Sequence, residues 1–123
     1  MAAIYSFKKR KRIDTNPDYQ RPAVWTKAQK QLLIDSILRD FDVPKIYLHE
    51  KNNDTYDVID GQQRIRAIWS FYDDEFALPK DAEPVNGYDV ANKKYSELDM
   101  DIATIIDSYN LDFVILDTQN KDE

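Results

Sequence analysis

Residues 55–72 read TYDVIDGQQRIRAIWSFY and contain the sharpest change of pattern in the chain. The first six residues alternate as a β-strand does, so that Tyr56 and Val58 face one side of it. Gly61 interrupts the alternation, and residues 62–72 then repeat apolar side chains at helical spacing. The sequence therefore predicts a strand that turns sharply into a helix at Gly61.

The residues before this junction predict a second helix and a hairpin. Thr26 and Gln29 have the spacing of a capping box that begins a helix. This helix carries an apolar stripe of Leu33, Ile34, Ile37, Leu38 and Phe41. Residues 45–50 read as a strand that pairs with residues 55–60 across a polar turn, and residues 12–15 read as extended.

The residues after the junction predict a loop, a helix and a last strand. Residues 73–87 are loop-rich, with a short strand at 76–78 as an option. Ser96 has the character of a helix N-cap, and residues 111–116 are apolar enough for a central strand. This order of elements predicts a small α+β domain.

Composition limits the protein to one domain and excludes several kinds of site. The chain has 123 residues and is 42% hydrophobic, which suffices for one core. With no cysteine and a single histidine, His49, it can form neither disulfides nor thiolate or multi-histidine metal centres. His49 is expected to be an ordinary strand residue. Apolar runs such as residues 113–116 are too short for a membrane helix, and the composition fits the cytoplasm.

The net charge of −6 conceals a strong asymmetry along the chain. Residues 1–66 hold 13 basic and 9 acidic residues, whereas residues 67–123 hold 4 and 14. An acidic chain argues against a broad nucleic-acid surface. The exception is a run of five cations, which is either a solvated stretch or a contact for polynucleotide phosphates: Lys8, Lys9, Arg10, Lys11 and Arg12.

The junction at residues 60–64 admits two interpretations. In the first it is only a well-made helix start, with Asp60 as N-cap and Gln63 in the reciprocal position of a capping box. In the second it is a phosphate cradle, because Gly61 lets an anion approach the helix amides and Arg64 offers a planar fork of donors. The amide side chains of Gln62 and Gln63 would then orient a water molecule or a phosphoryl oxygen.

A second polar cluster precedes the first helix. It consists of Tyr19, Gln20 and Arg21, followed by Trp25. Either these residues form a surface loop, or Arg21 reaches the same anion from the opposite wall of a cleft. The sequence alone does not bring the two clusters together.

These motifs, in this order, resemble the DUF262 domain. The resemblance rests on residues 16–21, Trp25 and residues 33–38, 43–46 and 58–64, and it covers about residues 12–116. DUF262 is the N-terminal domain of GmrSD-type, modification-dependent restriction proteins, in the ParB/sulfiredoxin-like group. The turn of that group, Gly-x-x-Arg-x-x-Ala, corresponds to Gly61, Arg64 and Ala67.

The resemblance implies a small mixed sheet with packed helices that binds, and in several members hydrolyses, a nucleoside triphosphate. By position, Asp60, Gly61, Gln62, Gln63 and Arg64 would form the triphosphate site, and Tyr19, Gln20 and Arg21 its other wall. Asp60 would hold a divalent cation, Mg²⁺ or Ca²⁺, or orient water. Gln63 would position the attacking water, so Asp60 and Gln63 are the expected catalytic residues.

The resemblance also implies partners. Related proteins regulate DNA cleavage that a C-terminal HNH-type nuclease domain performs, and one histidine cannot supply that nuclease here. We therefore expect this 1–123 domain to be truncated before a helical or nuclease region, and to act on DNA through the full-length protein or a partner subunit. Two other functions stay open: a ParB-like DNA-binding or nuclease module that uses the basic run, and a plain protein-interaction domain.

Overall fold

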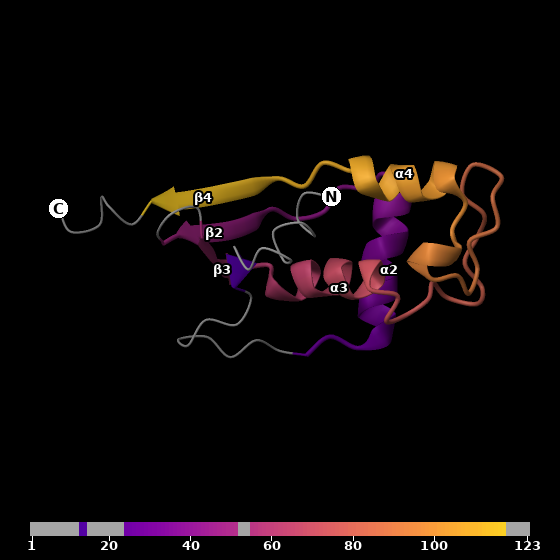
Figure 1. Ribbon diagram of the computed structural model, residues 1–123, viewed down its shortest axis with the longest axis horizontal. Coiled ribbons are helices and arrows are strands. Elements are labelled where there is room, and N and C mark those ends of the chain that lie inside the picture. The colour runs from indigo at the N-terminus through magenta and orange to yellow at the C-terminus, as the bar shows by residue number, and fades with distance from the viewer. Residues whose placement is uncertain (1–12, 15–23, 52–54, 118–123) are drawn as a thin grey trace.

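The computed structural model describes residues 13–14, 24–51 and 55–117 (Figure 1). Helices and strands gather in separate parts of the molecule, which confirms the predicted α+β class. In chain order the elements are β1 (Ile13–Asp14), α2 (Lys27–Leu38), β2 (Ile46–Glu50), β3 (Tyr56–Asp60), α3 (Gln62–Tyr72), the 3₁₀ helix η1 (Tyr95–Glu97), α4 (Met100–Ser108) and β4 (Phe113–Asp117).

The described strands form one mixed sheet in the order β1-β3-β2-β4. β2 and β3 pair antiparallel, which confirms the predicted hairpin, and His49 lies in β2 as expected. β4 runs parallel to β2, and β1 runs parallel to β3.

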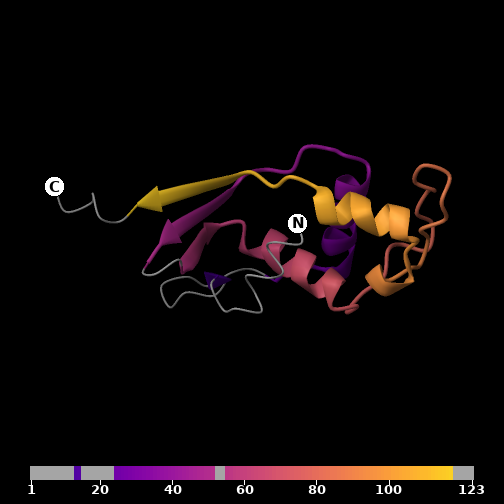
Figure 2. The ribbon, with the colours of Figure 1, turned by 45° about the horizontal axis from the view of Figure 1, so that its top comes forward.

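The prediction that the last strand is central is wrong for the described sheet. β4 lies at the end of the strand order, and Ile115 and Leu116 are 51% and 43% exposed. Apolar density normally marks a strand buried on both faces. Here it belongs to a strand that extends beyond the helices, as the figures show (Figures 1 and 2).

α2 begins with the capping box that the sequence predicts. The Gln29 amide donates to the Thr26 hydroxyl at 3.2 Å, and the Thr26 amide donates to the Gln29 side chain at 2.8 Å. Four residues of the apolar stripe are buried, but Phe41 is 58% exposed. Phe41 lies beyond the end of the helix, after Asp40 takes a positive φ of 60°. The apolar spacing in the sequence therefore predicted a longer helix than the one observed.

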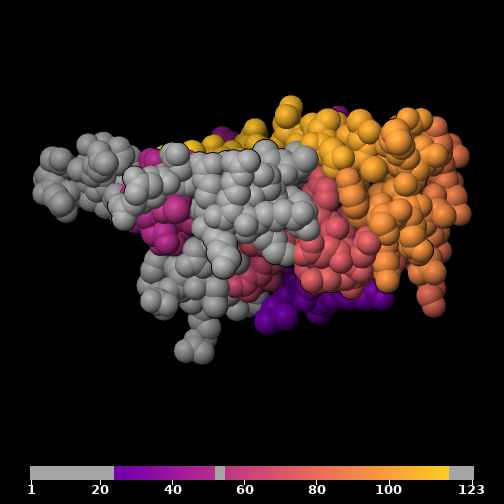
Figure 3. Space-filling view, viewed as in Figure 1, coloured from indigo at the N-terminus to yellow at the C-terminus, as the bar shows by residue number. Residues whose placement is uncertain are grey.

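Buried side chains form two clusters that share α3. One cluster packs α2, α3, α4 and residues 76–98 together. The other lies between the sheet and α3 and consists of Ile46, Leu48, Val58, Ile65 and Trp69. The space-filling view shows α3 side chains between α4 and α2 (Figure 3). Since α3 is packed at both ends, its first turn is held firmly against the sheet.

The segment between α3 and α4 differs from the sequence prediction in two places. Residues 76–78 form no strand, although Phe76 and Leu78 are buried and anchor the loop. Ser96 lies within η1, and the N-cap of α4 is Asp99, whose side chain accepts from the Asp101 amide at 2.9 Å. A 3₁₀ turn thus occupies the place where the sequence predicted the helix start.

One carboxylate ties the end of α3 to η1 and α4. The Tyr72 hydroxyl donates to Asp107 at 2.7 Å, and the Tyr95 hydroxyl donates to the same carboxylate at 2.9 Å. Burial, reinforced by the bond to Asp107, raises the pKa of Tyr95 to about 12 and raises the pKa of Tyr72 as well. Both tyrosines therefore keep their protons throughout the physiological range.

Candidate functional site

Gly61 makes the junction between β3 and α3 possible. It is the N-cap of α3 and has a φ of 107°, a conformation that side chains with a Cβ rarely adopt. A Cβ there would lie 3.0 Å from Ile46 Cγ1 and 3.2 Å from Arg64 Nη2. The position therefore requires glycine both for its backbone and for its close neighbours.

Asp60 does not cap the helix. No side chain caps the start of α3, and the Asp60 side chain is 70% exposed. The interpretation of residues 60–63 as a capping box is therefore wrong, because the left-handed turn at Gly61 makes the glycine, and not the aspartate, the N-cap. The Asp60 carboxylate is left available to solvent beside the helix.

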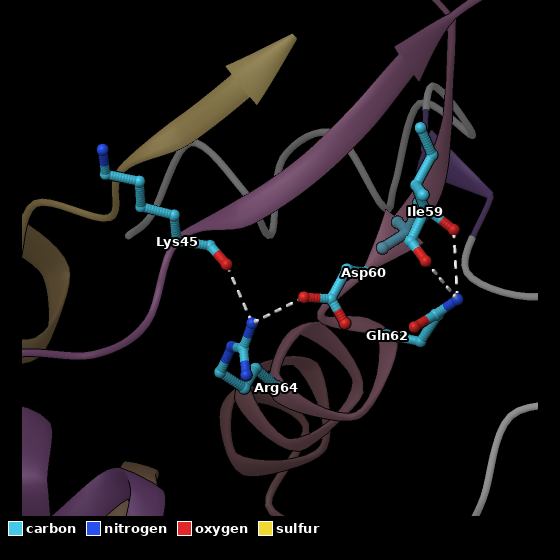
Figure 4. A network of polar contacts seen from close by, with 6 residues as sticks. Lys45, Ile59, Asp60, Gln62 and Arg64 are labelled. Carbon is cyan, nitrogen blue, oxygen red and sulfur yellow. Dashed lines mark hydrogen bonds and ion pairs between the residues drawn. The ribbon is translucent and has the colours of Figure 1, made fainter. Parts of the chain in front are cut away.

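Arg64 is held in place by backbone. Its Nη2 donates to the Lys45 carbonyl oxygen at 2.8 Å and lies 3.9 Å from the Asp60 carboxylate (Figure 4). The side chain is only 16% exposed. Within the described part of the chain, its Nε is buried and has no hydrogen-bond acceptor. A buried guanidinium donor without an acceptor is costly, so Nε keeps hydrogen-bonding capacity that the described residues leave unused.

The two glutamines of the junction point in different directions. Gln62 Nε2 donates back to the strand, to the carbonyl oxygens of Val58 and Ile59 at 3.1 and 3.3 Å (Figure 4). Gln63 Oε1 accepts from the Trp25 amide at 3.4 Å. Among the described residues, Gln63 Nε2 is buried without a partner. Gln62 thus braces the turn, whereas Gln63 faces the segment that leads into α2.

The contact between Trp25 and Gln63 brings the start of α2 to the junction. Trp25 therefore lies beside the first turn of α3, a proximity that the sequence could not establish. Tyr19, Gln20 and Arg21 themselves lie outside the described residues, as does the basic run from Lys8 to Arg12.

Two grooves meet at Trp25. One has a volume of about 340 Å³ and is mostly apolar; its lining residues are Trp25, Gln29, Leu32, Leu33, Ser36, Asp42, Val43, Pro44 and Arg64. The other has a volume of about 290 Å³ and contains two cations; its lining residues are Val24, Trp25, Lys30, Gln63, Arg66, Trp69 and Ser70. Sequence reasoning missed both grooves, because each combines segments that only tertiary packing brings together.

A larger groove among the described residues lies elsewhere. It measures about 490 Å³, between the outer face of α2 and residues 79–83. Its arginine, Arg39, already pairs with Asp35 at 3.0 Å. None of its lining residues belongs to the junction.

Comparison with known families identifies the chain. The family model described as the GmrSD restriction endonuclease, N-terminal domain, matches residues 2–123. The chain belongs to this family. Membership in the GmrSD N-terminal domain family confirms the resemblance to DUF262 and places the chain among restriction and phage-defence proteins. No curated protein and no solved structure matches it significantly.

The described residues of this GmrSD N-terminal domain hold no ready-made metal centre. Across residues 13–14, 24–51 and 55–117, no three histidine, cysteine or acidic side chains lie close enough together to hold a metal ion. No helix in the same ranges is long and apolar enough to cross a membrane.

Proposed function

We propose that this GmrSD N-terminal domain binds a nucleoside triphosphate through its phosphates at the start of α3, and that binding regulates DNA cleavage by the restriction protein. The observation that carries the proposal is the Arg64 guanidinium. It is oriented by the Lys45 carbonyl oxygen, largely buried, and left with an Nε that has no acceptor in the described part of the chain.

The start of α3 supplies the other half of a phosphate site. The first amides of a helix have no acceptor within the helix, and the helix dipole favours an anion there. Because Gly61 has no side chain, Ile46 and the Arg64 guanidinium pack closely against this turn. Arg64 Nη2 would lie 3.2 Å from a Cβ at position 61, so the guanidinium lies beside the first turn of α3, where an anion is favoured.

Asp60 is the residue that would hold a divalent cation. Its exposed carboxylate lies beside Arg64, and a cation shared with the phosphates would neutralise their charge and supply Lewis-acid chemistry. Gln63 keeps its predicted role of positioning water as a proposal, and its buried Nε2 has no hydrogen-bond partner among the described residues. Binding is the primary proposal, and hydrolysis is an extension of it.

A thermal-shift experiment tests the proposal. The four ribonucleoside triphosphates are screened with Mg²⁺ or Ca²⁺, against wild type, Arg64→Ala and the control Arg39→Ala. A ligand at 100 times its Kd stabilises by about 2.7 kcal/mol, which raises the Tm of a domain this size by several degrees. We expect Arg39→Ala to keep this shift and Arg64→Ala to lose it.

Arg64→Ala also has a stability effect of its own. Loss of the bond to the Lys45 carbonyl should lower the free energy of unfolding by about 1 kcal/mol without ligand. A variant that is destabilised but still shows the full ligand shift would contradict the proposal and leave Arg64 a purely structural residue.

A further inference from the structure

We infer that the apolar groove beside Arg64 receives the aromatic base of the nucleotide whose phosphates bind at the start of α3. The inference rests on the proposed function and adds to it the place of the nucleoside. It concerns the groove of about 340 Å³ between Trp25, α2 and residues 42–44.

The groove has the walls that an aromatic ring requires. Trp25 is half-buried against the helical core and presents a large apolar surface on one side. Val43 and Pro44 contribute to another part of the lining, and Leu32 projects from α2 with 65% of its surface exposed. An exposed leucine at the edge of an apolar groove gains stability when a flat apolar ligand covers it.

Arg64 connects this groove to the phosphate site. It lines the groove and at the same time borders the position of a Cβ at Gly61, so one side chain belongs to both places. A ligand that fits them together carries negative charge at one end and an aromatic ring at the other. A nucleotide has that combination.

The groove also offers polar groups for the edge of a base. Gln29, Ser36 and Asp42 are among its lining residues. Ligand sites are typically apolar with a few such groups that fix orientation. The neighbouring groove contains Lys30 and Arg66 and is less apolar.

The experiment separates the base from the phosphates. Binding of each ribonucleoside triphosphate and of inorganic triphosphate to the 123-residue chain is measured by calorimetry at one Mg²⁺ concentration. Two variants are compared, Leu32→Gln in the groove and Met100→Gln as the matched control. Met100 is 80% exposed on α4, so both changes remove an exposed apolar side chain from a helix without altering charge.

We expect at least one nucleoside triphosphate to bind about tenfold more tightly than inorganic triphosphate, as stacking of a base on an aromatic side chain would give. Leu32→Gln should weaken that nucleotide about fivefold and leave inorganic triphosphate unchanged, and Met100→Gln should change neither. The same nucleotide, but not inorganic triphosphate, should shift the indole N–H NMR signal of Trp25. The Trp69→Phe variant assigns that signal, because the chain has two tryptophans.

The possible failures are distinct. Equal affinity for the nucleotide and for inorganic triphosphate, with an unmoved Trp25 signal, would overturn the base site and leave the phosphate site standing. Tighter nucleotide binding that Leu32→Gln does not affect, again without a Trp25 shift, would place the base elsewhere. If neither ligand binds, the proposed function itself fails and this inference fails with it.

Discussion

At the scale of single residues, the two glycines of the chain show how much the surroundings of a backbone turn matter. Gly61 and Gly87 both have positive φ, 107° and 83°. A Cβ at Gly87 would have no neighbour within 4 Å, whereas one at Gly61 would press on Ile46 and on the Arg64 guanidinium. The two positions therefore share the backbone cost of an added side chain and differ in the steric cost.

Substitution of each glycine by alanine separates these two costs. Gly87→Ala should lower the free energy of unfolding by about 1 kcal/mol, from backbone strain alone. Gly61→Ala should cost about 3 kcal/mol, because Ile46 is fully buried in the sheet cluster and cannot move aside cheaply. Urea unfolding of both variants measures the difference. Equal costs would mean that the packing around Gly61 is looser than the structure shows.

The sequence predicted the sharp turn at Gly61 and the helix after it, but the interpretation that made Asp60 the N-cap was wrong. Asp before a helical pattern is a common cap signal, and only the φ of Gly61 reveals that the glycine is the N-cap. The orientation of Arg64 was equally beyond sequence reasoning, since its acceptor is a backbone carbonyl at Lys45. Every residue has a backbone carbonyl, so the residue types do not indicate which one a distant arginine will contact.

At the scale of elements, α2 and α3 begin in different ways. Thr26 and Gln29 bond each other's backbone amides at the start of α2, whereas α3 starts at a glycine without a side-chain cap. Local sequence was sufficient for α2, α3 and the β2–β3 hairpin, because each depends on neighbours in the chain. It was insufficient for β4, whose place beside β2 is set by pairing across more than sixty residues.

Alanine substitutions at the two helix starts test this difference. Thr26→Ala should destabilise the protein by about 1 kcal/mol through loss of the cap. Asp60→Ala should change stability by less than about 0.5 kcal/mol, because its exposed carboxylate caps nothing. Denaturant titration without nucleotide measures the free energy of unfolding of both variants. A large loss of stability in Asp60→Ala would mean that Asp60 has a structural role after all.

At the scale of the whole molecule, α3 joins the sheet cluster to the helical cluster. It packs on Ile46, Leu48 and Val58, and its far end is tied through Tyr72 to Asp107 of α4. Neither the two-cluster core nor this bond could be predicted from the sequence. The periodicity of α3 predicts that one face of the helix is buried, but it does not predict which elements pack against that face. The candidate grooves depend on the same long-range packing.

The Tyr95–Asp107 contact predicts a specific loss of stability in alkali. The folded-state pKa of Tyr95 is raised to about 12, above the ordinary value of about 10. Its contribution is therefore complete below pH 10 and is lost as the pH rises from 10 to 12. Unfolding midpoints should fall over that window in wild type and less steeply in Tyr95→Phe, which should cost about 1 kcal/mol at neutral pH.

The exposed Tyr47, which lies in the sheet, offers a control for the loss of a tyrosine hydroxyl. Tyr47→Phe should leave the stability at neutral pH close to that of wild type. If Tyr95→Phe titrates as wild type does, the alkaline loss arises elsewhere in the protein.

Full burial along the middle of α3 has a further consequence for ligand capture. Ile65, Ala67 and Ile68 have no exposed surface, so their amide hydrogens can exchange for deuterium only when the surrounding structure opens. The N–H groups one turn earlier are thus immobilised during folding. If an anion binds there as proposed, these donors are already ordered, so association would cost mainly the ordering of the anion itself.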